Sequence, residues 1–276
     1  MIKDAVVNLP VGNSESRVID FAVSVASTFN AHLAGVAFVY EPFVPTMDMG
    51  PIPADLIESQ RIENEKAAVA AISKFEEAAR RAAISAESGK LEAEFTGASG
   101  LFGRIARRFD LSIVAQAEPN KGGAEEQIIE AALFDSGRPC LIVPYIQKAD
   151  LKLNRIIVCW DGSRNSARAA ADAMPFLVRA KVVEVVVVSG ERGKSKELPG
   201  TDIAKHFARH GLNIELHDIV ASDPDVASTI LSHAADSDAD FIVMGGYGHS
   251  RLREFILGGA TRGILDSMTI PTLMSH

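Results

Sequence analysis

The sequence predicts an α/β fold built from two tandem, mainly parallel sheets of five strands each, flanked by helices. Three observations predict this class. Short apolar runs alternate with amphipathic stretches along the whole chain, and the same order of runs occurs twice. Runs such as Val185–Val188 are apolar at every position, as expected for strands covered on both faces. Strands that alternate with helices form βαβ units, which produce parallel sheets.

Composition narrows the functional classes. The chain has 276 residues, of which 47% are hydrophobic and 23% charged, as is typical of soluble globular proteins. Its formal net charge of -8 disfavours nucleic acid as a partner. No apolar run is long enough to cross a bilayer, and the first residues lack a signal-peptide pattern. Cys140 and Cys159 lie inside strand-like runs, so we expect buried thiols in a reducing cytoplasm.

In the first half, β-branched apolar runs predict five strands: Asp4–Leu9, Leu33–Tyr40, Lys90–Phe95, Asp110–Ala115 and Cys140–Val143. Helices are expected at Ser14–Phe29, Ala54–Ala86, Gly100–Phe109 and Ala124–Phe134. The long helix should bury one face and expose its charges on the other. The predicted buried face consists of Ile62, Val69, Ile72, Phe75 and Ala79.

The second half repeats this order, with strands expected at Arg155–Trp160, Val182–Ser189, Asn213–Val220, Asp240–Gly245 and Thr272–Ser275. Helices are expected at Asn165–Val178, Asp223–Ala235 and Ala260–Ser267. The second of these begins with an Asp-Pro-Asp sequence, a common start signal.

Two sequence echoes indicate a duplication. The segment that begins at Asp110 matches the one that begins at Asp240, and Arg138–Val143 matches Ile270–Ser275. A polar stretch around 145–154 separates the halves, which we define as domains 1–147 and 153–276. The apolar final strands of the two halves would leave exposed edges, so we expect them to pair within the chain.

A glycine-rich segment follows the fourth strand of the second half. Gly245, Gly248 and Gly258 precede the helix expected at Ala260–Ser267. Glycines let a backbone approach a ligand closely, and the free amides at a helix start favour an anionic phosphate. The segment matches neither the P-loop nor the Rossmann pattern. A surface loop punctuated by glycines is the alternative interpretation.

The G-x2-G-x9-G spacing of these three glycines resembles the ATP-binding loop of the universal stress protein family. The family usually has Ser or Thr after the third glycine, where this chain has Gly259. Thr261 matches another phosphate contact of the family. After the first strand of this half, Asp161 matches an aspartate that the family places near the adenosine. The resemblance extends over the chain as two tandem copies.

The resemblance implies an adenine nucleotide alpha hydrolase-like fold and a stress-response protein that binds ATP, ADP or AMP, with or without Mg²⁺, in its C-terminal half. Asp161 would accept a hydrogen bond from the ribose or help to hold the metal ion, and Val188 would contact adenine through its backbone. His249, inside the loop, is a candidate phosphate donor. The family pairs through its last strands, which implies a pseudo-dimer within the chain and leaves a homodimer open.

The first half is interpreted as degenerate for nucleotide binding. Pro10 aligns with Asp161, and the segment from Gln116 to Gly123 has no counterpart of Gly245 or Gly248. Glu118 adds negative charge where a phosphate would lie.

Two function classes stay open: a nucleotide-binding stress protein, and an interaction protein of the same fold that has lost the nucleotide. No catalytic residue is predicted, because the chain has no nucleophile-elbow motif and no Cys/His signature; at most slow ATP hydrolysis is expected. No metal site is predicted either. His206 and His210, four residues apart on an expected helix, are interpreted as surface residues.

Overall fold

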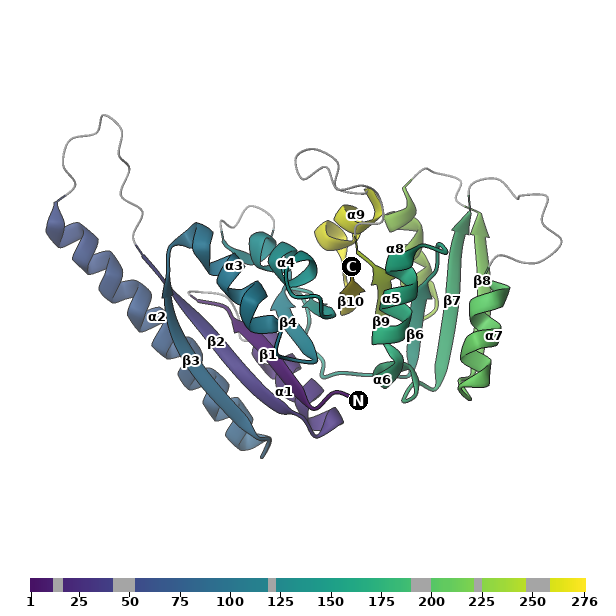
Figure 1. Cartoon of the computed structure of the whole chain (residues 1–276), viewed down its shortest axis with the longest axis horizontal. Coiled ribbons are helices and arrows are strands. Elements are labelled where there is room, and N and C mark those ends of the chain that lie inside the picture. Colours follow the sequence, from purple (N-terminus) through teal and green to yellow (C-terminus); the bar gives the residue numbers. More distant parts are fainter. Residues whose placement is uncertain (12–16, 42–52, 119–122, 190–199, 221–224, 247–258) are drawn as a thin grey trace. The chain divides into compact units, whose positions relative to one another are not determined.

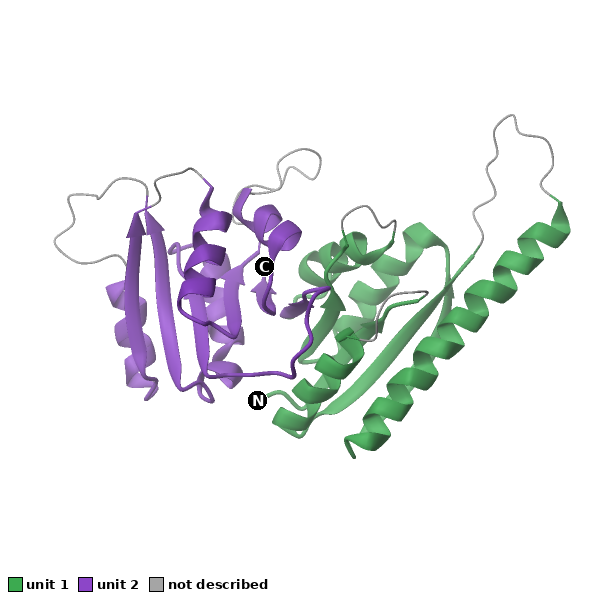
Figure 2. Ribbon diagram, turned by 180° about the vertical axis from the view of Figure 1, so that it is seen from behind, with its two compact units in different colours: residues 1–138 green, residues 139–276 purple. Residues whose placement is uncertain are grey.

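The computed structural model describes residues 1–11, 17–41, 53–118, 123–189, 200–220, 225–246 and 259–276. It divides into two compact units, Met1–Arg138 and Pro139–His276, coloured separately in Figure 2. Both units alternate strands with helices, and five strands come from each half of the sequence. The predicted α/β class is therefore confirmed.

Unit 1 contains a parallel sheet in the order β3-β2-β1-β4. Its strands are β1 (Asp4–Leu9), β2 (His32–Tyr40), β3 (Ala86–Ala93) and β4 (Leu111–Ala115). Helices α1 (Arg17–Phe29) and α2 (Ala54–Arg81) cover one face of the sheet, while α3 (Phe95–Ala106) and α4 (Glu125–Phe134) cover the other (Figures 1 and 2). Because both faces are covered, β1 is buried at every position after its first.

Unit 2 has the strand order β5-β10-β9-β6-β7-β8. Its strands are β5 (Cys140–Val143), β6 (Arg155–Cys159), β7 (Val182–Ser189), β8 (Ile214–Val220), β9 (Phe241–Gly245) and β10 (Thr272–Ser275). Its helices are α5 (Arg164–Asp172), α6 (Met174–Leu177), α7 (Thr201–Arg209), α8 (Val226–Asp236) and α9 (Gly259–Ser267).

The two final strands pair, as the sequence predicts. β5 runs antiparallel to β10, with Leu141 opposite Leu273, and every residue of both strands is buried. This pairing covers the apolar edge of β10 and assigns β5 to the second unit, although the sequence repeat groups it with the first half. The contact boundary at residue 138 thus differs from the domain limits expected from the repeat.

The amino-terminal edges of the two sheets share one hydrogen-bond arrangement. In unit 1, Asp110 Oδ2 accepts the backbone N–H groups of Lys3 (2.8 Å) and Asp4 (3.2 Å). In unit 2, Asp240 Oδ2 accepts those of Asn154 (2.8 Å) and Arg155 (3.0 Å). The sequence echo between Asp110 and Asp240 therefore corresponds to the same local structure, in which a carboxylate fixes the start of β1 or of β6.

The predicted buried face of the long helix is partly wrong. Ile62 and Val69 are 41% and 51% exposed, and Ile72 is half-buried. The buried residues are Ala68, Ala71, Phe75, Ala78 and Ala79. No residue of α2 before Ala68 is buried, so Phe75 and four alanines in the C-terminal half of the helix make the contact with the core.

Several expected bounds were also wrong: β3 starts at Ala86 where Lys90 was expected, and the helix expected at Gly100–Phe109 is Phe95–Ala106. The third strand was expected to end at Phe95, but β3 ends at Ala93, and Phe95 starts α3 after the extended residue Glu94. β3 has exposed positions throughout its length, so it lacks the apolar run that marks a buried strand. The helix expected at Asn165–Val178 is divided into α5 and α6, because Pro175 has no N–H to continue the ladder of α5.

Among the described residues, none of the helices has the length and apolar character that a bilayer-spanning segment requires.

Candidate functional site

The carboxyl edge of the unit 2 sheet begins with the turn after β6. Asp161 Oδ1 accepts the Ser163 N–H at 2.9 Å, and Gly162 has a positive φ of 73°. Ser163 then caps α5, because its side chain accepts the Ser166 N–H at 3.1 Å. The Asp-Gly-Ser sequence thus forms a local turn and a helix start in three residues.

The charge on Asp161 is favoured by this turn. Desolvation by the surrounding chain raises its pKa, but hydrogen bonds from Ser163 and Ser166 outweigh that effect and lower the pKa below its ordinary value. The neighbouring thiol behaves in the opposite way. Burial, with a contribution from the Asp161 charge, raises the pKa of Cys159 to about 12. This edge therefore carries an ionised carboxylate and an unreactive thiol at neutral pH.

The end of β9 lies directly against the first turn of α5. A Cβ at Gly245 would stand 2.6 Å from both the Asn165 carbonyl carbon and the Ser166 nitrogen. The glycine is required by this close approach. Next to it, Asn165 Nδ2 donates to the Gly246 carbonyl at 2.6 Å. The Asp161 turn and the end of β9 are thereby held together through α5.

His276 joins the same group from the end of β10. Its Nδ1 lies 3.1 Å from the Gly246 carbonyl oxygen and 3.0 Å from Asn165 Nδ2. β10 runs parallel to β9, so both strands end at this edge. No sequence pattern marks Asn165 or His276 as a site residue. An Asn four residues after a turn aspartate is a weak signal by itself, and only the fold brings Asn165 and His276 together.

Helix α9 starts after β9 with an exposed Gly259, and a Cβ there would meet no atom within 4 Å. Thr261 is 4% exposed, so its side chain belongs to the packed side of this helix. Further along, a Cβ at Gly263 would lie 2.6 Å from Ala227 Cβ, which shows how closely α9 packs on α8.

The expected site residues therefore fall into four groups. Asp161 and Gly245 are brought together at α5. Gly259 and Thr261 lie in the first turn of α9, and Val188 is half-buried near the end of β7, where it pairs with Ile219 of β8. Gly248, His249 and Gly258 lie outside the described residues.

The comparisons with known proteins agree with this fold. The model of the universal stress protein family matches residues 152–276. Universal stress protein Slr1230 of Synechocystis is 23% identical over 163 residues, which are 57% of this chain and 52% of the relative. The match thus spans about half the length of that curated relative.

Solved structures extend the likeness over both halves. A universal stress protein from Archaeoglobus fulgidus superposes with a TM-score of 0.70 at 16% identity, covering 99% of this chain and 95% of that one. A putative universal stress protein from Pseudomonas aeruginosa gives a TM-score of 0.62 at 15% identity, covering 99% and 93%. At these identities the likeness establishes the fold alone. Residues 152–276 of this chain are a domain of the universal stress protein family.

Proposed function

We propose that the C-terminal half, residues 153–276, binds one adenine nucleotide of the ATP type at the carboxyl edge of its sheet. The observation that carries the proposal is the meeting of the Asp161 turn with the glycine end of β9, at the edge from which α9 starts. Parallel sheets bind their ligands at this edge.

The residues present suit such a ligand. The ionised Asp161 offers a carboxylate to a ribose hydroxyl or to a Mg²⁺ ion that bridges phosphates. The start of α9, with its exposed Gly259, would offer backbone amides and the positive end of a helix dipole to a phosphate. Val188 would contact adenine through its backbone. The residues proposed to contact the phosphates are Gly248, His249, Gly258 and Thr261.

The first half lacks the same groups. Ala5 pairs with Leu111 in unit 1 as Ile156 pairs with Phe241 in unit 2. Counting along the strands from these pairs, Ala115 is the counterpart of Gly245, and Gln116 is the counterpart of Gly246. Pro10 follows β1 where Trp160 and Asp161 follow β6. We therefore expect no more than one nucleotide per chain.

A second candidate function is an interaction protein of the same fold without nucleotide. Two observations favour it: Thr261 is buried, and Asp161 already accepts a hydrogen bond within its own turn. In either case we expect a cytoplasmic protein, because both cysteines are free thiols. We assign no hydrolytic residue.

Calorimetric titration of the full chain with ATP, ADP and AMP, with and without Mg²⁺, tests the proposal. We expect one site per chain that Asp161→Ala weakens, while the melting temperature stays close to that of the parent chain. Asp150→Ala, which removes an exposed carboxylate between β5 and β6, is the matched control. Two equivalent sites per chain would contradict the asymmetry, and the absence of any binding would favour the interaction protein.

A further inference from the structure

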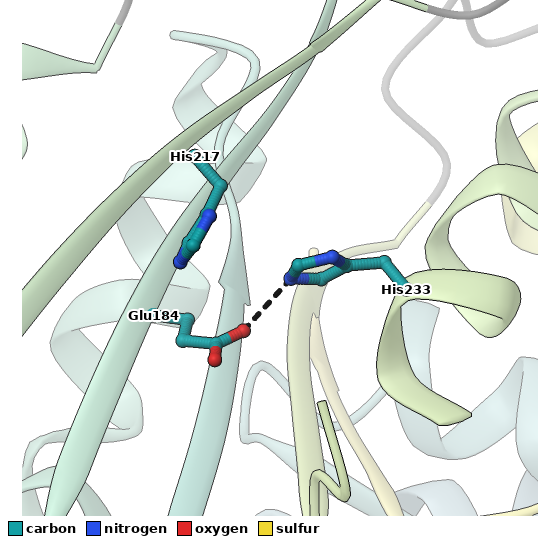
Figure 3. Close-up of side chains that lie close together, drawn as sticks. All are labelled: Glu184, His217 and His233. Carbon is teal, nitrogen blue, oxygen red and sulfur yellow. Dashed lines mark hydrogen bonds and ion pairs between the residues drawn. The ribbon is translucent and has the colours of Figure 1, made fainter. Parts of the chain in front are cut away.

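A second group of polar side chains lies inside unit 2, away from the carboxyl edge. Glu184 from β7, His217 from β8 and His233 from α8 place one donor atom each within 4.8 Å of one another (Figure 3). Glu184 is the third residue of its strand, and His233 lies in the last turn of a helix that returns from the end of β8 to the start of β9. The group therefore lies towards the amino-terminal half of the strands.

The Glu184 carboxylate is buried and held from two sides. Its residue is 1% exposed. Arg155 Nη1 binds Oε1 and also donates to Glu215 Oε2 at 2.8 Å. His233 Nε2 lies 2.8 Å from Glu184 Oε2. A buried carboxylate needs such partners, so this part of the group is stable without any ligand.

His217 is the member that the protein itself leaves incomplete. Its Nε2 atom is buried and has no hydrogen-bond partner within the part of the chain that the structure describes. The Glu215 carboxylate is 3.8 Å away, beyond hydrogen-bond reach, and the His217 and His233 rings lie 5.1 Å apart between centroids. A buried polar atom without a partner calls for an explanation, and a bound ion supplies one.

We infer that Glu184, His217 and His233 bind a divalent transition-metal ion, with Zn²⁺ as the type case. Two imidazole nitrogens with one carboxylate are donors that select zinc, nickel and copper over magnesium and calcium. Donors about 2.0–2.2 Å from a tetrahedral zinc ion stand roughly 3.3 Å apart. Glu184 Oε2 and His233 Nε2, which are 2.8 Å apart, would therefore separate slightly, while the His217 ring closes any larger gap to them, which is at most 4.8 Å. Water would occupy the fourth position, or the Glu215 carboxylate, 3.8 Å from His217 Nε2, would reach it after a side-chain movement.

Charge and access fit such an ion. With neutral imidazoles, the two carboxylates and Arg155 leave this group with one net negative charge. Arg155 can keep its contact with Glu184 Oε1 while Oε2 turns to the metal, so the guanidinium fixes the carboxylate from outside the coordination shell. The His217 side chain is 39% exposed although its Nε2 atom is buried, so the group lies close to the protein surface. The bound ion would link three elements to one another: β7, the edge strand β8 and helix α8.

Zinc binding by the full, untagged chain after removal of metal with EDTA tests the inference. We expect one Zn²⁺ per chain in competition with a chromogenic chelator, and the visible absorption of tetrahedral Co²⁺ when cobalt replaces zinc. His217→Ala and His233→Ala should each weaken binding roughly tenfold or more. They should also remove the rise in melting temperature that zinc produces in the parent chain.

The matched control is the double variant His206→Ala with His210→Ala. These two rings, one in α7 and one directly after its end, lie 4.8 Å apart and form the most obvious rival site. The inference requires that this variant bind zinc like the parent chain. Equal zinc affinity in the parent chain and in His217→Ala, or loss of binding in the double variant, would overturn it. Because the readout is metal binding, the result does not depend on whether the chain binds nucleotide.

Discussion

The two units are alike at one edge of their sheets and different at the other. At the amino-terminal edge, Asp110 and Asp240 make the same pair of hydrogen bonds, to the start of β1 and of β6 respectively. At the carboxyl edge, unit 2 has an ionised aspartate and a close glycine contact, where unit 1 has Pro10 and Ala115. The features that set the fold occur twice, and those that suit a ligand occur once.

This difference separates structural residues from functional ones without an alignment. A carboxylate that two units place in the same position, with the same partners, is explained by strand geometry alone. A residue that only one of two similar units contains has no such explanation. Asp161 and Gly245 belong to that second group, and so do Glu184 and His217, whose register counterparts in unit 1 are Ala34 and Gly89.

The largest expected effect tests the shared edge. Asp240→Ala removes the acceptor of two backbone N–H groups and should lower the free energy of unfolding by about 1.5–3 kcal/mol. Asp110→Ala should have a similar cost in unit 1. Urea midpoints measure both, and Asp240→Asn, which keeps an acceptor oxygen, is the control. If only one of the two alanine variants were destabilised, the shared edge would not be structurally equivalent.

The second prediction tests the edge that differs. Gly245→Ala should destabilise the protein by about 1–3 kcal/mol, because the new Cβ would lie 2.6 Å from backbone atoms of α5. At the equivalent position of unit 1, Ala115→Gly should cost no more than about 1 kcal/mol. Chemical denaturation of the two variants gives the comparison. Equal effects would mean that the close approach of α5 to β9 is not a special feature of unit 2.

Much of the fold could be predicted from the sequence because buried strands leave a strong pattern. The bounds of β1, β5, β7 and β10 match the expected ones, since each is a short run with a clear apolar signal. The bounds and buried faces were predicted least well for elements that have one side exposed to solvent. β3 is exposed along its length, and the start of α2 has apolar residues that it does not bury.

The sites were less predictable, for a physical reason. Asp161 is visible because its turn chemistry is local, within three residues. In the Glu184 group, His217 and His233 lie 33 and 49 positions after Glu184 in the sequence. Only the strand register and the return of α8 bring the three side chains together. One signal was available: Glu184 interrupts an otherwise apolar run of valines, and a charge in a buried strand requires a partner.

A smaller effect would sharpen the proposed nucleotide site. Gly259→Ser restores the hydroxyl that the family usually has at this position, and a Cβ there meets no atom within 4 Å. If the start of α9 binds phosphate, ATP affinity should rise by about 0.5–1.5 kcal/mol, a typical net hydrogen bond. Titration calorimetry measures it, and Gly259→Ala adds the Cβ without the hydroxyl. A serine variant that behaves like the alanine one would place the phosphates elsewhere.

The smallest effect concerns acid stability and separates Asp161 from its counterpart Pro10. The pKa of Asp161 is lowered in the folded protein, so its charge stabilises the fold above the ordinary pKa of about 3.8. That contribution is lost as the pH falls through the lower, folded-state pKa. Asp161→Asn cannot titrate and keeps an acceptor for the Ser163 N–H. Its melting temperature should therefore be slightly below that of the parent chain at neutral pH, and the gap should close in acid. Asp150→Asn, at an exposed aspartate, controls for the loss of one negative charge. A gap that stays constant across the acid range would show that the turn at Asp161 does not favour the carboxylate, and the contrast between the two carboxyl edges would then rest on Gly245 alone.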